Sequence, residues 1–393
     1  MTINFRTLAV FLTGSCAMLD IYSTQPLLAE MTAEFGVAAT RGSWTITATT
    51  LAVALAAPFA GSISDYVGRK CVMVPAVLGL TIATILCAFS PTLEIMILLR
   101  FIQGLFIPFI FAVAIAYIGE EWDSTEGAKI NAIYISGSVF GGFCGRFISG
   151  IATANAGWRS SFIALALYSS IVVIVIVKYL PREKNFRPAN SLLSSFSSMG
   201  THSRNSQFLA TCFVGATIMF VQVALFTYAT LYLAAAPFSL SSTVLGSIFA
   251  VFLIGVIITP IAGNAIYHFG YKATFIAACS LAWCGLVLCL LPQVAAIIVG
   301  LACCSTGVFI GQACATSYAA FTAGEAKSSG VGLYLTCYYL GGSLGAILPA
   351  PIFRQWGWLG CILLFFIVFF LGLIVAVRCW PNRVWTPTAN TRT

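Results

Sequence analysis

The sequence predicts an all-α integral membrane protein in which twelve membrane-spanning helices form two pseudo-symmetric halves of six. Composition is the first observation, because 60% of the residues are hydrophobic and only 8% are charged, whereas about 25% are charged in soluble domains. The second is a series of apolar runs long enough to cross a hydrocarbon core of about 30 Å. The third is a repeat of glycine positions at an offset of about 200 residues.

The apolar runs divide the chain into spans with mostly short connections. The predicted spans cover residues 7–29, 43–63, 72–89, 94–118, 129–151, 160–180, 207–233, 243–265, 272–291, 294–318, 329–351 and 358–380. An even number of spans places both termini on one side. With cytoplasmic termini, fourteen of the nineteen Lys and Arg residues lie inside, and Arg41, Arg159 and Arg354 lie outside. This asymmetry follows the positive-inside rule and predicts cytoplasmic termini.

One long polar segment separates the sixth span from the seventh. Residues 181–206 hold Pro181, several basic residues and a serine-rich stretch at 191–198. We therefore expect an N-terminal six-helix half at 1–180, a cytoplasmic linker at 181–206 and a C-terminal six-helix half at 207–393.

The two halves repeat a set of glycine positions. Gly61, Gly68 and Lys70 recur as Gly263, Gly270 and Lys272; Gly141, Gly142 and Gly145 recur as Gly341, Gly342 and Gly345; and Gly157-Trp158 recurs as Gly357-Trp358. The charges do not recur, because Asp65 and Arg69 correspond to Tyr267 and Tyr271. We infer a duplicated architecture in which the ion-pairing chemistry stays in the N-terminal half.

The connection between the second and third spans carries the most specific motif. Its residues Gly61, Asp65, Gly68, Arg69 and Lys70 follow the pattern G-x-x-x-D-x-x-G-R-K. This pattern resembles the signature loop of the major facilitator superfamily. The resemblance implies a major facilitator bundle with a central cavity, and a loop that latches the two halves together on the cytoplasmic side. An ordinary charged turn that only sets orientation is the alternative.

Three charged residues stand clearly within predicted spans, away from the span ends: Asp20 in the first, Arg100 in the fourth and Arg146 in the fifth. A charge at the bilayer centre costs at least about 2.5 kcal/mol on insertion scales, so each is a candidate functional group. All three lie toward the outer side of the membrane and can share one polar cluster. We expect Asp20 to hold a proton in one facing state and to pair with Arg100 or Arg146 in the other. A permanent structural ion pair is the alternative.

Arg100 also begins a short motif, Arg100-Phe101-Ile102-Gln103-Gly104. Gln103 and Gly104 return to the face of Arg100 by the helical spacing of three and four residues. The motif resembles the R-x-x-Q-G pattern in the fourth span of proton-coupled members of the superfamily, which implies that Arg100 tunes proton binding. An arginine satisfied by backbone carbonyls is the alternative.

The fifth span is rich in glycine at helical spacing. Gly137, Gly141, Gly142 and Gly145 permit close packing of a neighbouring helix. Exporters of the drug:proton antiporter group usually show G-x-x-x-G-P-x-x-G-G here, whereas this chain has Gly142 for the proline and Arg146 for the last glycine. With these departures the chain looks more like the YnfM-type transporters, a resemblance that implies the bacterial inner membrane.

Other polar and aromatic residues in the spans are candidates for the wall of a solute cavity. They are Tyr22, Gln25, Gln103, Gln222, Phe226, Gln312, Tyr334 and Tyr338. Helix packing is the alternative role for such residues. Because two arginines face one aspartate in the membrane, no spare acid is left for a lipophilic cation, and a neutral or anionic solute is favoured.

The sequence argues against several other classes of protein. The cysteines and histidines lack metal-ligand spacing, so we expect no metal and no cofactor. We see no nucleophile–base pair in the spans, which makes an intramembrane enzyme the least favoured class. The net charge of +8 lies at span ends, so it indicates membrane topology and not nucleic-acid binding.

We predict a secondary active transporter that moves a small organic solute by alternating access, most favourably outward in exchange for protons. Its expected partners are the solute, protons and the lipid bilayer, and we expect a monomer. Two rivals stay open. An importer, by symport or facilitated diffusion, would move the solute inward, and a receptor or scaffold with a transporter fold would move none.

Overall fold

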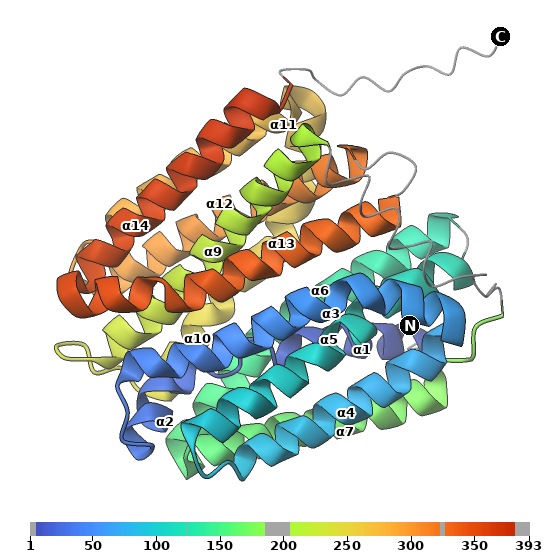
Figure 1. Ribbon diagram of the computed structural model, residues 1–393, viewed down its shortest axis with the longest axis horizontal. Coiled ribbons are helices and arrows are strands. Elements are labelled where there is room, and N and C mark those ends of the chain that lie inside the picture. The colour runs from blue at the N-terminus through green and yellow to red at the C-terminus, as the bar shows by residue number, and fades with distance from the viewer. Residues whose placement is uncertain (1–4, 123, 185–204, 323–326, 382–393) are drawn as a thin grey trace.

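The computed structural model describes residues 5–122, 124–184, 205–322 and 327–381, and these residues form helices with no strand among them. Figure 1 shows two groups of helices side by side, α1 to α7 and α9 to α14. This arrangement confirms the predicted all-α class with two halves. Most of the predicted linker, at 185–204, lies outside the described residues.

The helices follow the predicted spans to within a few residues at most ends. In the first half they are α1 (Phe5–Leu19), η1 (Gln25–Leu27), α2 (Leu28–Glu34), η2 (Ala39–Ser43), α3 (Trp44–Val67), α4 (Arg69–Ala88), α5 (Leu93–Glu121), α6 (Ser124–Ala156) and α7 (Trp158–Tyr179). In the second half they are α9 (Ser206–Ala234), α10 (Ser242–Ile248), η3 (Phe249–Leu253), α11 (Ile254–Leu288), α12 (Val294–Thr322), α13 (Lys327–Ile347) and α14 (Pro349–Cys379). The first and eighth spans are each divided into short pieces, and α11 continues from the eighth span into the ninth.

Four glycines with positive φ mark equivalent turns in the two halves. Gly68 and Gly157 have φ of 109° and 77°, and their counterparts Gly270 and Gly357 have φ of 81° and 60°. Side chains with a Cβ rarely adopt this conformation, so glycine is needed where one span turns into the next. The repeat seen in the sequence is therefore also a repeat in the backbone.

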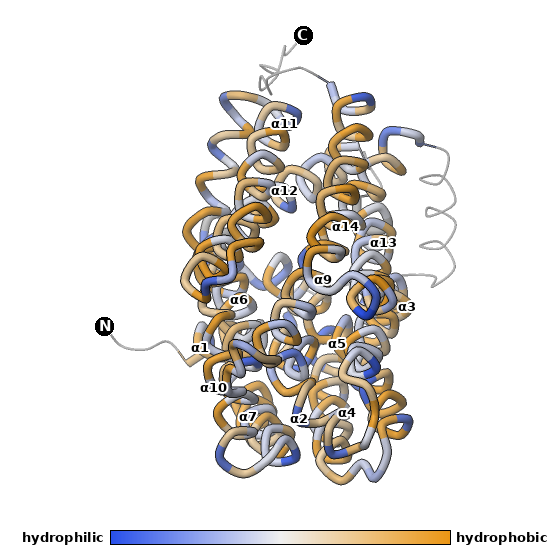
Figure 2. Tube along the Cα trace, turned by 90° about the vertical axis from the view of Figure 1, so that its left-hand side faces the viewer, coloured by the Kyte–Doolittle hydropathy of each residue, from blue (hydrophilic) through white to orange (hydrophobic). Residues whose placement is uncertain are grey.

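The outer surface of the bundle is apolar. Large side chains such as Leu55, Ile82, Ile171 and Ile257 are at least half exposed, and Figure 2 shows hydrophobic residues along most of the helix lengths. Among the described residues, eight helices are long and apolar enough to cross a membrane. Lipid tails can cover such a surface, whereas water cannot do so without a large cost.

Small residues allow paired helices to pack very closely within each half. A Cβ at Gly137, Gly141 or Gly145 of α6 would lie well inside 3.0 Å from a carbonyl oxygen of α1. In the second half, a Cβ at Gly341 or Gly345 of α13 would meet carbonyl oxygens of α9 in the same way. Backbone packing of this kind is typical of membrane helices, which gain little from burying apolar surface against each other.

The two halves touch near the connections at 35–38 and 235–241. Thr47 of α3 donates to the carbonyl of Ser343 on α13 at 3.0 Å, and the Ser343 hydroxyl donates to the carbonyl of Thr47 at 3.2 Å. Ser242 of α10 bonds Glu30 of α2 near the same end. These contacts hold the halves together at the end of the bundle opposite Phe5 and Tyr179.

We predict that Gly141→Ala destabilises the protein by roughly 1–3 kcal/mol, because the added methyl group would collide with the backbone of α1. The measurement is the thermal unfolding of the purified protein in detergent. Gly119→Ala on α5 is the matched control, since a Cβ there meets nothing within 4 Å. Equal stability of the two variants would contradict this account of the packing of α1 and α6.

Candidate functional site

A cavity of about 300 Å³ lies between the two halves. It is lined by Met18, Tyr22, Gln25, Phe111, Ile135, Ser138, Val139, Gly142, Arg146, Met219, Gln222, Val223, Phe252, Phe309, Gln312, Leu335, Tyr338 and Tyr339. Both halves contribute, so a solute in this cavity would contact the two bodies whose relative position has to change during transport. The volume is at the lower end of the range for small-molecule sites.

Five of the eight residues predicted for the cavity wall line this cavity. They are Tyr22, Gln25, Gln222, Gln312 and Tyr338. The structure places the other three, Gln103, Phe226 and Tyr334, elsewhere.

Each of these three has a different set of neighbours. Gln103 is fully buried, and its Oε1 accepts a hydrogen bond from Arg100. Phe226 packs against the rings of Phe249 and Phe252 at 5.4 and 4.5 Å, which places it behind the wall. Tyr334 stacks on Tyr338 at 5.9 Å and is itself buried.

The first span is interrupted at residues 20–24, between the end of α1 and the start of η1. Pro26 follows the interruption and has no backbone N–H to offer an upstream carbonyl, so it favours a break at this point. The N–H of Gln25 bonds the carbonyl of Tyr22 at 3.1 Å, which leaves the carbonyl of Ile21 available. Interrupted helices of this kind are common at the binding sites of transporters.

Arg100, on α5, is fully buried and reaches the interrupted segment. Its Nη2 donates to the carbonyl of Ile21 at 2.7 Å, and its Nη1 donates to Oε1 of Gln103 at 2.8 Å. Nε2 of Gln103 donates in turn to the hydroxyl of Thr84 on α4 at 2.7 Å. A backbone carbonyl thus satisfies part of the guanidinium, and a chain of hydrogen bonds joins α5, α4 and the break in the first span.

Asp20 lies at the start of the interruption and is fully buried. Both carboxylate oxygens lack a hydrogen-bond partner among the described residues. The charge of Arg100 acts on Asp20, but no nitrogen of that arginine lies within 4.0 Å of the carboxylate. A carboxyl group with no direct hydrogen bond or ion pair to the described residues, but within reach of the charge of Arg100 and near Thr84, therefore stands in the interior of the first half.

Arg146, on α6, occupies different surroundings. It lines the central cavity and lies against the rings of Tyr22, Phe249 and Phe252, at 4.8, 4.6 and 4.9 Å from the ring centres. The expectation that all three intramembrane charges share one cluster is therefore not met. Asp20 and Arg100 lie together away from the cavity lining, and Arg146 faces the cavity, because α6 turns this side chain toward the second half.

Gln25 connects Arg146 to the second half of the protein. Its Oε1 accepts a bond from Nε of Arg146 at 2.7 Å, and its Nε2 donates to the hydroxyl of Thr227 on α9 at 3.0 Å. Gly142, predicted for helix packing with its glycine neighbours, instead lines the cavity, and its carbonyl accepts a bond from Nη1 of Arg146.

The charged loop after α3 is bonded within the first half. Nη1 of Arg69 pairs with Asp65 at 2.5 Å, and its Nε and Nη2 donate to Glu120 of α5 at 3.1 and 2.5 Å. Glu183, after α7, accepts the backbone N–H groups of Arg69 and Lys70 at 2.9 and 3.4 Å. A carboxylate at this helix N-terminus is favourable, because the exposed N–H groups carry partial positive charge.

Among the described residues, no hydrogen bond or ion pair found for this loop reaches the second half, and the latch between the halves stays a prediction. The partners found for Arg69 and Lys70 within the described ranges all belong to the first half. A physical reason is the arrangement of the bundle, in which the contacts between halves lie near the opposite end. Gly61 has open space around it, and Gly68 supplies the positive φ of the turn.

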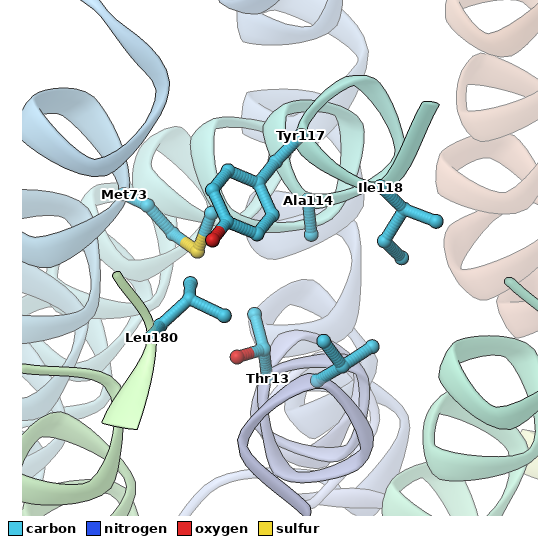
Figure 3. Close-up of a pocket in the computed structure, with 7 residues that line it drawn as sticks. Thr13, Met73, Ala114, Tyr117, Ile118 and Leu180 are labelled. Carbon is cyan, nitrogen blue, oxygen red and sulfur yellow. The ribbon is translucent and has the colours of Figure 1, made fainter. Parts of the chain in front are cut away.

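A second cavity, of only about 10 Å³, lies inside the first half (Figure 3). Its wall comes from α1, α4, α5 and the residue after α7, and Thr13 and Tyr117 contribute its polar side chains. This volume is about that of a single water position. It is a packing gap and has no room for a solute.

Several residues that contact Arg69, Gln103 and Arg146 were not predicted from the sequence. Glu120 could have been found, because an acid at the inner end of a span is a natural partner for Arg69. Thr84, Phe249 and Phe252 carried no such signal, because each stands in an apolar run where many residues could face a neighbour.

The helical bundle, its apolar outer surface and a cavity shared by two halves define a membrane transporter. The model of the Major Facilitator Superfamily matches residues 10–346, and the chain belongs to that superfamily.

Similar proteins match this chain over nearly their whole length. The chain is 29% identical to the "Inner membrane transport protein YnfM" of Escherichia coli K12, covering 95% of this chain and 89% of that protein. It is also 29% identical to an "Uncharacterized transporter" of Buchnera aphidicola from Schizaphis graminum, covering 95% and 91%. A bacterial homologue of the human lysosomal transporter Spinster, solved facing inward, has a TM-score of 0.75 at 14% identity, covering 99% and 100%. That structural likeness supports the fold alone.

We predict that Glu120→Gln lowers the free energy of unfolding by about 1–3 kcal/mol, because charge-assisted bonds to the largely buried Arg69 are weakened. Glu94→Gln is the control, since Glu94 is 66% exposed and its contact with Arg41 is 3.4 Å long. The control should change stability by less than about 0.5 kcal/mol. Equilibrium unfolding in mixed micelles measures both, and an equally small effect of the two substitutions would refute the proposed importance of this network.

Proposed function

We propose that the protein is a proton-coupled secondary transporter that exports a small organic solute across the bacterial inner membrane. Asp20 is the observation that carries the proposal, because it is a buried carboxyl group with no hydrogen-bond partner among the described residues. An ionised carboxylate in such surroundings is very costly, whereas a protonated one is not. In a chain of a transporter superfamily, such a group is suited to carry the coupling proton.

Two six-helix bodies, residues 1–180 and 207–393, would move relative to each other, with the linker at 181–206 between them. With cytoplasmic termini, the contacts between Thr47 and Ser343 close the outer end, and the cavity belongs to an inward-facing state. Rocking of one body against the other would expose the cavity to the opposite side. A monomer is the proposed working unit.

Arg100 is the partner that would change the proton affinity of Asp20. In this conformation Ile21 and Gln103 hold its guanidinium, and Asp20 has no contact with it. A small movement at the interrupted segment would bring the carboxylate to the guanidinium, and this pairing would favour proton release. Asp20 would thus carry a proton taken up from the outer side, and pairing with Arg100 while the cavity faces the cytoplasm and binds its solute would release that proton to the cytoplasm before the transporter turns outward.

The proton gradient and the membrane potential would drive export, and the potential contributes about 2.3 kcal/mol per charge per 100 mV. The similarity to YnfM of Escherichia coli K12, which is named an inner membrane transport protein, supports the inner-membrane location.

We predict that Asp20→Asn abolishes proton-driven export while preserving the fold, because asparagine keeps the shape of the side chain but cannot exchange a proton. The measurement is the accumulation of labelled sugars, organic acids and neutral antibiotics in efflux-deficient bacteria. Wild type should lower the accumulation of at least one solute, and an uncoupler or Asp20→Asn should restore it to the level of cells with an empty vector. Glu94→Gln, at an exposed position, should behave as wild type.

The direction of the effect separates the rival functions. Higher accumulation with wild type would identify an importer and contradict the export proposal. If wild type lowers accumulation and Asp20→Asn does so equally, Asp20 is not the coupling group. Exchange of labelled for unlabelled solute across vesicles without a gradient is the control for folding, because a folded Asp20→Asn variant should still perform it.

Reporter fusions test the proposed orientation. Green fluorescent protein fused after Thr393 should fluoresce, and alkaline phosphatase at the same place should be inactive, because phosphatase folds only outside the cytoplasm. Phosphatase inserted in the connection at 235–241 should be active. The reverse pattern would show that the termini lie outside and would overturn the inward-facing assignment.

A further inference from the structure

We propose that the central cavity selects organic monoanions, with a carboxylate on an apolar or aromatic body, and that Arg146 binds the carboxylate. This inference rests on the proposed transport function, since it names the class of solute for the same cavity. It concerns binding alone, however, and can be tested without a gradient.

The lining of the cavity carries one positive charge. Among the described residues that line it, Arg146 is the one with a formal charge at neutral pH. Its side chain is 4% exposed, and the ion pairs found in the described part of the chain do not include it. A buried cation without a counter-ion favours a ligand that brings one negative charge.

The guanidinium of Arg146 also has a hydrogen-bond donor that is not used within the described structure. Nε bonds Gln25, and Nη1 bonds the carbonyl of Gly142. Nη2 makes no hydrogen bond to the described residues, and it is not among the buried polar atoms shut off from space. A planar carboxylate fits the fork of a guanidinium with two parallel bonds, so the open edge of Arg146 suits this group.

Aromatic rings surround the guanidinium of Arg146. Tyr22 comes from the first half, and Phe249 and Phe252 come from the second, with ring centres between 4.6 and 4.9 Å from the guanidinium carbon. Ring faces attract a cation but do not neutralise it. A carboxylate would supply the missing negative charge. Its bonds to the guanidinium would compete with the ring contacts that connect the two halves.

The remaining wall fits an apolar body of limited size. Phe111, Ile135, Phe309 and Leu335 supply apolar surface within a volume of about 300 Å³. A lipophilic cation would meet the charge of Arg146 with no acid in the lining, and a dianion would leave one charge uncompensated.

The test compares carboxylates with their uncharged amides. Benzoate, 2-naphthoate and hexanoate are titrated against the purified full-length protein in lipid nanodiscs by calorimetry, beside benzamide, 2-naphthamide and hexanamide. At least one acid should bind on the order of 30-fold or more tightly than its amide, because the amide leaves the buried cation unpaired. Arg146→Gln should abolish this preference, and Arg146→Lys should restore part of it.

Two further variants make the result specific. Arg159→Gln is the matched control, because Arg159 is an arginine outside the cavity that pairs with Glu34, and it should keep the preference for acids. Asp20→Asn should also keep it, since this substitution removes proton coupling and leaves the cavity wall intact. If Asp20→Asn loses export but still binds benzoate more tightly than benzamide, proton coupling has failed while anion binding is intact.

Three results would overturn the proposal. The first is that no acid binds more tightly than its amide. The second is that Arg146→Gln, with a thermal unfolding profile like that of wild type, keeps the preference. The third is that Arg159→Gln loses the preference to the same extent as Arg146→Gln, which would indicate a general effect of positive charge.

Discussion

The cost of placing charge inside an apolar bundle is the constraint on which the rest of this structure depends. Arg100 is accommodated because the first span is interrupted and a backbone carbonyl, that of Ile21, becomes available to its guanidinium. Gln103 and Thr84 extend the same chain of bonds to α4. The break in the helix and the buried arginine therefore explain each other: a continuous helix would keep its carbonyls for itself.

Asp20 and Arg146, the two other charged groups within the membrane, have fewer compensating contacts than Arg100. In the proposed mechanism this leaves Asp20 able to exchange a proton and Arg146 able to bind a solute. Asp20 has no hydrogen-bond partner among the described residues and lies beside a guanidinium that is already bonded. Arg146 rests on aromatic rings and one glutamine at the cavity wall. In the proposed mechanism, proton binding and solute binding therefore belong to separate groups. The interrupted segment joins them, because Asp20 lies at its start and Gln25 directly follows it.

Close backbone packing makes each half rigid and so holds Asp20, Arg100 and Arg146 in defined positions. The glycines of α6 against α1, and of α13 against α9, bring the helix axes together where a Cβ would prevent it. The two halves also pack closely against each other, because a Cβ at Gly150 of α6 or at Gly246 of α10 would collide with the backbone of the other helix, and a few hydroxyl groups and a glutamine add hydrogen bonds across the interface. Alternating access would require these contacts between rigid halves to open and re-form.

The sequence by itself determined the helical class, the positions of the spans and the repeat of turns at Gly68 and Gly270, because apolar length and backbone freedom are local properties. It also identified Asp20, Arg100 and Arg146 as unusual. Only the tertiary structure separated Arg146 from the other two and placed Phe226 and Tyr334 outside the cavity lining. The reason is that the face a helix turns toward its neighbours depends on how all the helices pack together, and a hydrophobic pattern on every side of a helix does not specify it.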